Sequence, residues 1–522
     1  MWQTKEERYD LLKRLVAIPS ISRTPSEKEV PRFLYHECLK LAYFKKNPHY
    51  LHADELYFSA LVKGKTNKTI VLISHYDVVG VDDYKNEKDM AFELEKMTAF
   101  YQSRNQEKES GEWVYGRGTM DMKAGLVIEM GLLEQASTGE FDGTILLIAV
   151  GDEEVGSKGM LAATKEIKRL QTEEHLDIVL CVNTEPSFKE HPLDQNKYIY
   201  TGTIGKLLPS FYLRGQETHV GEPFAGLNAS FMASILTNEL ELSSDFQEEI
   251  DGEKTQVLTN LYMRDNKLFY DVQTPISANC YFNLLFMEQT VASVTEKLLA
   301  KTNDIAQGIL TQYEKKAKKA GVKPVPFTIR TVLFEELYNE VVEKLGVEKV
   351  ESKMKEVISK YEGFDERMRS LKMVECVSEL SGVQTPMIVL FYSPPFYPAV
   401  SSRNHPLVQT LAGSVQQFAQ YKYGIVLEKR AFFQGLCDLS YVSAPTDNIE
   451  SLVRNMPLFG KGYDIPFETI AQFDFPVLNL GPFGADPHQR TERLELNYSF
   501  DILPDLLTKL VHECLKEIDK KR

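Results

Sequence analysis

The stretch TILLIAVGDEE, residues Thr144 to Glu154, decides the fold of this chain. Its first part, Thr144 to Val150, is a continuous apolar run of strand length, which is typical of a strand buried on both faces of a parallel sheet. Gly151 ends the run, and an Asp-Glu-Glu triplet follows at once. The stretch therefore predicts a buried strand whose carboxyl end carries acidic side chains.

Three further apolar runs resemble this one, at Thr69 to Ile73, Asp177 to Val182 and Pro476 to Leu480. Helical patterns lie between them, beginning near Asp121 and spanning Ser157 to Leu170. Buried strands that alternate with helices indicate an α/β domain. We expect a mixed, largely parallel sheet with helices on both of its faces.

The first helices are predicted by their N-terminal signals. Thr4 with Glu7, and Ser26 with Glu29, each match the spacing of a capping box. Apolar residues at helical spacing follow both pairs, and Pro19 ends the first run. Two helices are therefore expected before the first buried strand.

With 522 residues the chain exceeds the roughly 250 to 300 residues that one hydrophobic core can serve, so at least two domains are expected. From about Tyr200 to Pro395 the pattern changes to alternating runs beside a long charged helical segment, Phe334 to Leu380. We predict a catalytic domain made of residues 1–198 and 396–522. Residues 199–395 would form an inserted α+β lid or dimerisation domain, with a hinge at the prolines 394, 395 and 398.

Composition limits the partners and the compartment. Lys and Arg total 60 against 75 Asp and Glu, a net charge of -15, which would repel nucleic acid and anionic lipid. No apolar run reaches the roughly 18 residues of a membrane span, and Met1 to Arg14 lacks the apolar stretch of a signal peptide. The six cysteines include no C-x-x-C pair, so we expect reduced thiols in a cytoplasmic protein.

Ionisable side chains follow each predicted strand. They are His75 and Asp77 after the first run, Glu153 and Glu154 after the second, Glu185 after the third and His488 in the loop after the fourth. Because ligands bind beyond the carboxyl ends of the strands in an open α/β sheet, these side chains are expected to meet at one edge.

So many carboxylates in one cleft would repel one another, and divalent cations are the usual means of stabilising such a cluster. Imidazole and carboxylate without thiolate suit zinc, with cobalt or manganese as substitutes. Taken singly, a histidine after a strand is more often a surface residue, and an Asp-Glu-Glu run is more often a solvated turn. Their coincidence at four strand ends favours a metal site.

The segment GRGTMDMKAG, Gly116 to Gly125, places Asp121 at the start of a helix. Alone, an acid at that position is best interpreted as a helix cap. Together with the other candidate ligands, its carboxylate can bridge two ions.

These motifs, in this order, resemble the M20 family of metallopeptidases and amidohydrolases. The matching pattern is H-x-D, G-R-G-x-x-D-x-K-x-G, D-E-E-x-G-S-x-G, an acid after the next strand and a late histidine. In length and in the segment GEWVYGRGTMDMKAG the chain is most similar to the RocB arginine-utilization branch.

The resemblance implies two divalent metal ions and a role for each motif residue. Asp121 would bridge the ions, with His75 and Glu185 on one and Glu154 and His488 on the other; Asp77 would orient His75, and Glu153 would be the general base. In the inserted domain, T-H-V-G-E-P and G-L-N-A resemble family signatures, which implies that His219 stabilises the oxyanion, often across a homodimer interface, and that Asn228 contacts substrate.

One departure bears on the substrate. Desuccinylase-like members hold a substrate carboxylate with an Arg and an earlier Asn, and the aligned residues here are Leu285 and Asp271. Either Arg330 or Arg403 substitutes, or the substrate presents no carboxylate at this point. Asp271 would favour a cationic group, as in an arginine-derived substrate.

The expected activity is hydrolysis of an amide bond in a small molecule or short peptide, of the peptidase or N-acyl amino acid deacylase type. The alternative from another class is a degenerate family member that binds or regulates. A degenerate enzyme commonly loses a ligand or the base, and all of these residues are present here. A two-metal phosphoesterase is a third and less favoured interpretation.

Overall fold

The computed structural model describes residues 1–104, 111–187, 194, 196–443 and 449–520. The chain forms two compact units. Unit 1 comprises Met1–Ile204, Val400–Ala444 and Pro466–Arg522, and unit 2 comprises Gly205–Ala399 and Pro445–Ile465. The segment Pro445–Ile465, which the expected boundaries left with the catalytic domain, thus lies in unit 2, where the backbone carbonyl of Asn455 accepts a hydrogen bond from the Tyr392 amide.

Unit 1 is built on an eight-stranded sheet within the described part of the chain. In spatial order its strands are β1 (Leu51–Ala53), β2 (Tyr57–Val62), β5 (Thr144–Val150), β3 (Lys68–His75), β6 (Asp177–Asn183), β18 (Val477–Asn479), β7 (Lys197–Tyr200) and β17 (Leu427–Arg430). The neighbouring pairs β5–β3, β3–β6 and β6–β18 in the centre of the sheet are parallel. The pairs β1–β2, β2–β5 and β18–β7 are antiparallel.

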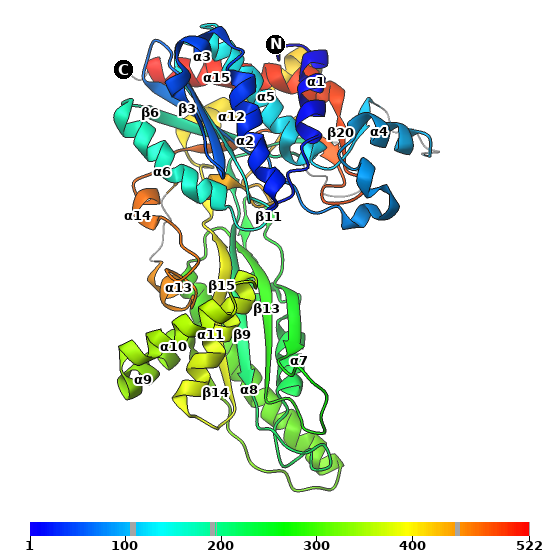
Figure 1. Ribbon diagram of the computed structural model, residues 1–522, viewed down its shortest axis with the longest axis vertical. Coiled ribbons are helices and arrows are strands. Elements are labelled where there is room, and N and C mark those ends of the chain that lie inside the picture. Colours follow the sequence, from blue (N-terminus) through cyan, green and yellow to red (C-terminus); the bar gives the residue numbers. More distant parts are fainter. Residues whose placement is uncertain (105–110, 188–193, 195, 444–448, 521–522) are drawn as a thin grey trace. The chain divides into compact units, whose positions relative to one another are not determined.

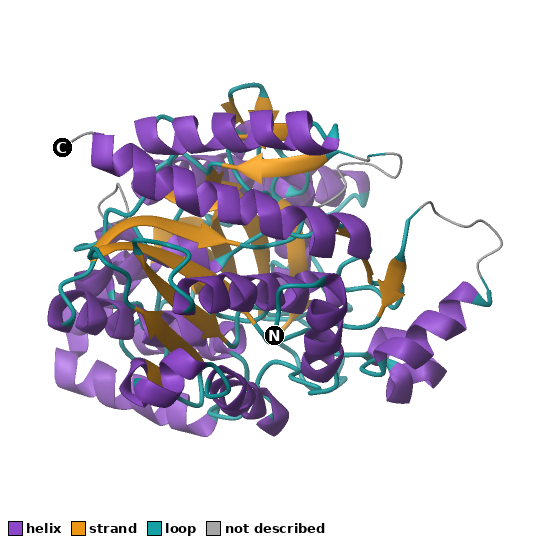
Figure 2. Ribbon diagram, turned by 90° about the horizontal axis from the view of Figure 1, so that it is seen from above, coloured by secondary structure: helices purple, strands orange, loops and turns teal. Residues whose placement is uncertain are grey.

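The central strands are continuous apolar runs because both of their faces are buried. On β3, Ile70 and Leu72 face the main apolar core, and the alternate residues Val71 and Ile73 are buried as well. Helices cover the two faces (Figure 2). The mixed, largely parallel sheet with helices on both faces is therefore confirmed.

The helices of unit 1 are α1 (Lys5–Val16), α2 (Glu29–Cys38), α3 (Ala42–Lys46), α4 (Leu94–Gln102), α5 (Ala124–Ser137), α6 (Lys158–Glu173), α12 (Pro406–Tyr423), α14 (Phe467–Ile470) and α15 (Leu503–Lys520). The core cluster joins side chains of α1, α2, α5, α12 and α15, and α6 contacts β2 and β5. The Thr4 capping box begins α1 as predicted. At the second site, Ser26 lies inside a short 3-10 helix, Pro25–Lys28, so the capping box predicted there is wrong.

Two small sheets complete unit 1. One pairs β16 (Val400–Ser401) with β8 (Gly202–Thr203), and the other has the order β19 (Gly484–Ala485), β20 (Arg493–Glu495), β4 (Trp113–Tyr115). The second sheet joins the chain just before the GRGTMDMKAG segment to the loop that carries His488. Residues from both ends of the sequence are therefore fixed next to each other.

Unit 2 has a five-stranded sheet in the order β12 (Thr259–Asp265), β13 (Ser277–Phe286), β9 (Gly205–Arg214), β15 (Met387–Tyr397), β14 (Arg330–Leu333). Its helices are α7 (Ala229–Leu240), α8 (Val291–Lys319), α9 (Phe334–Leu345), α10 (Val347–Lys360), α11 (Glu366–Ser381) and α13 (Glu450–Arg454). The helical segment predicted at Phe334 to Leu380 is thus confirmed as α9, α10 and α11, with α11 packed on β15 and β9 (Figure 1).

The prolines 394 and 395 lie within strand β15, although they were expected in a hinge. Proline cannot donate a hydrogen bond to a neighbouring strand. Accordingly, the register between β15 and β9 shifts between Ser393 and Tyr397, where the ladder is interrupted.

Among the described residues, no helix has the length and apolar character that crossing a bilayer requires.

Gly481 fixes the approach of the chain after β18 to the chain after β6. A Cβ atom added at Gly481 would lie 2.0 Å from the carbonyl oxygen of Glu185, so only glycine fits without moving the backbone. Gly413, inside α12, is different: apart from its chain neighbours and the nearby backbone of its own helix, an added Cβ would meet no heavy atom of the described residues within 4 Å.

Substitution at these two glycines should have opposite effects. Gly481→Ala should lower the free energy of unfolding by about 1–3 kcal/mol, because the added carbon overpacks a closed site. Gly413→Ala should raise it by about 0.5–1 kcal/mol, because alanine is the better helix former. Urea unfolding followed by circular dichroism measures both, and equal midpoints for the two variants would contradict the close approach.

Candidate metal centre

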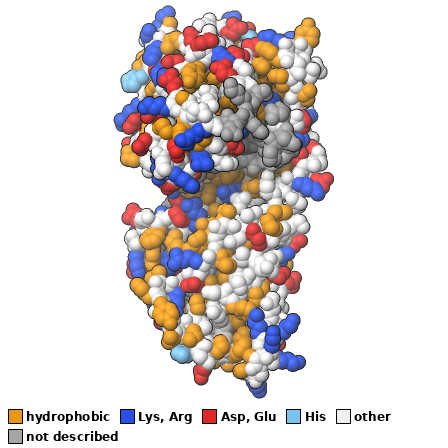
Figure 3. Space-filling view, turned by 90° about the vertical axis from the view of Figure 1, so that its right-hand side faces the viewer, with side chains coloured by type: hydrophobic (Ala, Val, Ile, Leu, Met, Phe, Trp, Pro, Cys, Tyr) orange, Lys and Arg blue, Asp and Glu red, His pale blue; other side chains and the backbone are white. Residues whose placement is uncertain are grey.

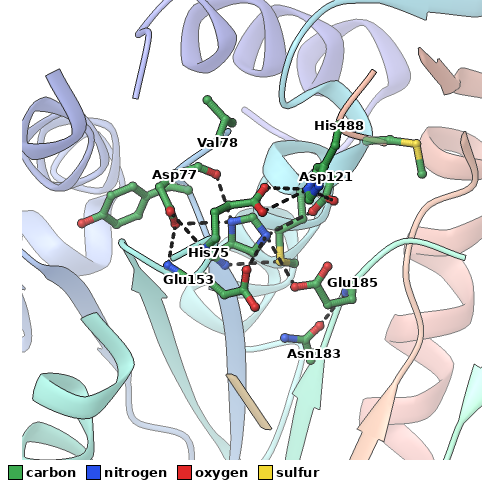
Figure 4. A network of polar contacts seen from close by, with 12 residues as sticks. His75, Asp77, Val78, Asp121, Glu153, Asn183, Glu185 and His488 are labelled. Carbon is green, nitrogen blue, oxygen red and sulfur yellow. Dashed lines mark hydrogen bonds and ion pairs between the residues drawn. The ribbon is translucent and has the colours of Figure 1, made fainter. Parts of the chain in front are cut away.

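The first candidate group consists of His75, Asp121 and Glu185. His75 is the last residue of β3, Glu185 follows β6, and Asp121 lies in the turn Thr119–Lys123 just before α5. His75 Nε2 is 3.1 Å from Asp121 Oδ1 and 3.5 Å from Glu185 Oε1. All three side chains are buried and point toward one another (Figure 4).

The second candidate group consists of Asp121, Glu154 and His488. His488 Nε2 is 3.0 Å from Glu154 Oε1 and 3.2 Å from Asp121 Oδ2. The side chain of His488 is 49% exposed, so this group is the more accessible of the two. Asp121 belongs to both groups and uses a different oxygen in each.

Asp77 organises the chain around His75. The Nδ1 atom of His75 lies 3.0 Å from the backbone carbonyl of Asp77 and 3.5 Å from its carboxylate. The carboxylate accepts hydrogen bonds from the backbone amides of Glu153 at 3.1 Å and Glu154 at 3.3 Å. Asp77 thus orients the imidazole chiefly through its main chain, and its side chain holds the loop that carries the Asp-Glu-Glu triplet.

Arg117 and Glu492 hold the turn that carries Asp121. The buried Arg117 guanidinium donates to Glu492 Oε2 at 2.9 Å. The other oxygen of Glu492 accepts from the amides of Met120 at 3.3 Å and Asp121 at 3.5 Å. Lys123 is also buried, and its ammonium donates to two backbone carbonyls at the end of α1, at 2.9 and 3.1 Å. The Arg and Lys of the GRGTMDMKAG segment therefore position the turn.

The pKa values of the clustered side chains are shifted because many ionisable groups lie close together in a buried place. Burial alone would raise the pKa of Asp121, but hydrogen bonds from His488 and His75 lower it. Burial would lower the pKa of His488, but hydrogen bonds to Asp121 and Glu154 raise it to about 11. Without a metal ion, protons on the imidazoles balance the carboxylates. Divalent ions would take over this role and displace those protons, so the donor set fits such ions.

Glu153 lies beside the first group, with Oε2 3.9 Å from His75 Nε2. Burial raises the pKa of Glu153 well above its usual range, and the nearby carboxylates of Asp438, Glu185 and Glu154 raise it further. A carboxyl group with raised proton affinity beside a candidate metal site suits proton transfer.

The residues predicted in the inserted domain all lie in unit 2. The Gly221 amide donates to His219 Nδ1 at 3.0 Å, which places the proton of a neutral ring on Nε2. Asn228 is the N-cap of α7, and its side-chain oxygen accepts from the Ser230 amide at 2.8 Å. The part of Asn228 that remains for a ligand is its amide nitrogen.

Two of the residues that bear on substrate charge, Asp271 and Arg330, are already paired. Asp271 is exposed and forms an ion pair with Lys267, and the hydrogen bond from Lys267 lowers its pKa. This pair reduces the attraction of Asp271 for a cationic ligand. Arg330 likewise pairs with Glu340. Leu285, in β13, has no charge to offer a carboxylate.

Three residues that support the site were missed by the sequence analysis, namely Glu129, Asp438 and Glu492. All are buried carboxyl groups, and burial raises the pKa of Glu129 to about 8 and the pKa of Asp438 and Glu492 to about 7. In the sequence, Glu129 reads as one polar residue in a helix. Glu492, four residues after His488, offered the better signal because it shares the loop of a predicted ligand.

Comparisons with known proteins agree with this geometry. A family model described as Peptidase family M20/M25/M40 matches residues 71–455. YqjN of Bacillus subtilis (strain 168) is 39% identical, covering 99% of this chain and 98% of YqjN. Protein RocB of the same organism is 31% identical, covering 94% of this chain and 92% of RocB.

Similarity among solved structures supports the fold. The M20 family metallo-carboxypeptidase Sso-CP2 from Sulfolobus solfataricus has a TM-score of 0.56 at 12% identity, covering 98% of this chain and 99% of that one. The family model spans more than half of the sequence, and both Bacillus subtilis relatives align along nearly all of it. The chain therefore belongs to the M20 peptidase family, on its RocB-like branch.

Proposed function

We propose that this protein is a two-metal amidohydrolase that cleaves an amide or peptide bond in a small substrate. One observation carries the proposal: Asp121 gives one carboxylate oxygen to each of two groups of metal-ligating side chains. Membership of a peptidase family supports hydrolysis of a peptide bond or a similar amide bond. The resemblance to the RocB arginine-utilization branch makes arginine-containing amides, together with N-acylated ones, the first substrates to test.

The residues that would hold the ions are His75, Asp121 and Glu185 for one and Asp121, Glu154 and His488 for the other. Nitrogen and oxygen donors without thiolate fit zinc, and cobalt or manganese as substitutes. When bound, such ions supply Lewis-acid chemistry that polarises an amide carbonyl and acidifies water.

Glu153 is proposed as the general base. Its carboxylate takes a proton from the attacking water and returns it to the leaving nitrogen, so that the amine departs uncharged. Burial and three neighbouring carboxylates raise its proton affinity, which favours the first transfer. Asp77 supports this role because its side chain holds the amide of Glu153.

His219 is proposed to donate a hydrogen bond to the oxyanion that forms during attack. The Gly221 amide on Nδ1 leaves Nε2 as the donor of the neutral ring. His219 lies in unit 2 and every proposed metal ligand lies in unit 1, so the histidine acts from its own chain or from a second copy.

A homodimer through unit 2 is proposed as the assembly that supplies this histidine. Strand β12 lies at the edge of the five-stranded sheet, and an edge strand can pair with another chain. The loop after it exposes Leu268, Phe269 and Tyr270 by 78%, 83% and 93%. Hydrophobic side chains are visible on the surface of unit 2 in Figure 3. Exposed apolar groups of this kind are typical of protein interfaces.

Metal content tests the proposed bridge. Asp121→Ala should remove both ions because one carboxylate serves each, whereas His488→Ala should mainly weaken one. Elemental analysis of dialysed, folded protein measures the stoichiometry. Two ions per chain retained in Asp121→Ala would disprove the bridging role.

A substrate screen with a matched variant tests the reaction and the base. Wild-type protein loaded with zinc, cobalt or manganese should release amine from at least one N-acyl amino acid or dipeptide. On that substrate Glu153→Gln should lower turnover by roughly 10² to 10⁴ while metal stays bound, because the amide cannot accept the proton. Glu166→Gln, at a buried carboxylate paired with Arg169, is the control and should keep turnover. Equal turnover in Glu153→Gln and wild type would eliminate Glu153 as the base.

Subunit mixing tests His219. His219→Ala should lower turnover by roughly 10² to 10³ without loss of metal, because one oxyanion donor is removed. If the histidine comes from a second copy, mixing His219→Ala with Glu153→Gln chains should restore part of the activity, since one hybrid site then holds both intact residues. Verified heterodimers without recovered activity would exclude action across the interface.

A further inference from the structure

Glu129, in the middle of α5, has a carboxyl group that lies completely inside unit 1. Ser74 Oγ lies 2.8 Å from its Oε2 atom, and Thr184 Oγ1 lies 3.0 Å from its Oε1 atom. Both hydroxyl groups are buried as well. One glutamate side chain therefore joins a helix to the ends of two neighbouring strands.

The two hydroxyl groups that contact Glu129 lie next to residues of the candidate metal group. Ser74 directly precedes His75, and Thr184 directly precedes Glu185. Strands β3 and β6 are parallel neighbours with Ile73 opposite Asn183, so Ser74 and Thr184 are the next residues of each chain. Because side chains alternate along a strand, the two hydroxyls turn toward α5, and the ligand residues after them turn toward the candidate metal group.

The third residue of the same group, Asp121, is carried by the turn in front of the helix. This turn leads directly into α5. The first turn of α5 also closely approaches the residue that follows β6, because a Cβ atom at Gly125 would lie 2.5 Å from both the carbonyl oxygen and Oγ1 of Thr184. Glu129 and Gly125 thus hold α5 against the segments that carry the other two ligands.

Burial of a carboxyl group is costly unless its hydrogen-bonding capacity is used. Burial raises the pKa of Glu129 to about 8, and each of its two oxygens has one buried hydroxyl group as its hydrogen-bond partner. Each hydroxyl can either donate or accept, so the pair satisfies both oxygens. A fully satisfied buried network of this kind fixes geometry.

We propose that Glu129 is a positioning residue that sets the spacing of His75, Asp121 and Glu185 by tying β3, β6 and α5 together, and so controls the affinity of the metal group that they form. The inference rests on the proposed function, because it requires that this group binds an ion. A purely structural tie would change the stability of the fold and leave metal affinity unchanged. Metal affinity is therefore the decisive measurement.

Conservative and apolar variants separate the two roles. Glu129→Gln keeps a donor, an acceptor and the shape, and should bind zinc within about threefold of wild type. Glu129→Met fills the same space without polar atoms, and its affinity at the first group should fall by about 10- to 100-fold, the usual effect of losing a partner behind the ligands. Competition with a chelator measures zinc affinity, and the visible spectrum of the cobalt-loaded protein reports ligand geometry.

Two further variants secure the interpretation. The triple variant Ser74→Ala/Glu129→Met/Thr184→Val removes every member of the network, leaves no orphaned polar group, and should show the same loss of affinity in a folded chain. Glu134→Met is the control on the same helix. It removes hydrogen bonds to the N-terminal segment, so it should lower the thermal midpoint and leave zinc affinity unchanged.

The outcomes distinguish the positioning role of Glu129 from the proposed function on which it rests. Wild-type zinc affinity and an unchanged cobalt spectrum in both Glu129→Met and the triple variant would overturn the positioning role while leaving the metal site intact. A wild-type chain that takes up no zinc or cobalt would overturn the proposed function, and the positioning role with it.

Discussion

The carboxylate of Asp121 contacts two imidazoles, one through each oxygen. The surrounding parts of unit 1 hold the segments that make these two contacts possible. Repulsion among the nearby acids is large in a buried site. Hydrogen-bond donors at fixed places surround these acids and hold the segments that carry them. Arg117 acts through Glu492, Lys123 binds the end of α1, and the amides of the Asp-Glu-Glu loop bind Asp77.

The core of the fold, and most of the side chains that gather at one edge of its sheet, could be predicted from local sequence because they follow from one rule. A strand buried on both faces must be continuously apolar, as β5 is, and the residues that follow such a strand face the ligand edge. The predictions of β3, β5, β6 and β18 depended on that rule alone. His75, Glu154, Glu185 and His488 were predicted because each follows one of these strands.

Features that depend on contacts between distant residues could not be predicted in this way. Glu492 binds Arg117, from which it is separated by 375 positions. The assignment of Pro445–Ile465 to unit 2 depends on contacts such as that of Asn455 with Tyr392. At Ser26 the local pattern was misleading, because Pro25 begins a 3-10 helix before α2 can start. The role of Glu129 depends on two hydroxyls that its own helix does not contain.

The sequence separation between Arg117 and Glu492 also constrains how the protein is made. At roughly 5–20 residues per second, a ribosome needs about 20–75 s to synthesise the segment between them. For most of that interval the nascent chain contains His75, Asp121 and Glu185, but neither His488 nor the carboxylate that holds the Asp121 turn. All three side chains of the group formed by His75, Asp121 and Glu185 therefore come from the first half of the chain, whereas His488 and the Glu492 carboxylate that holds the Asp121 turn are added only when the C-terminal segment has been synthesised.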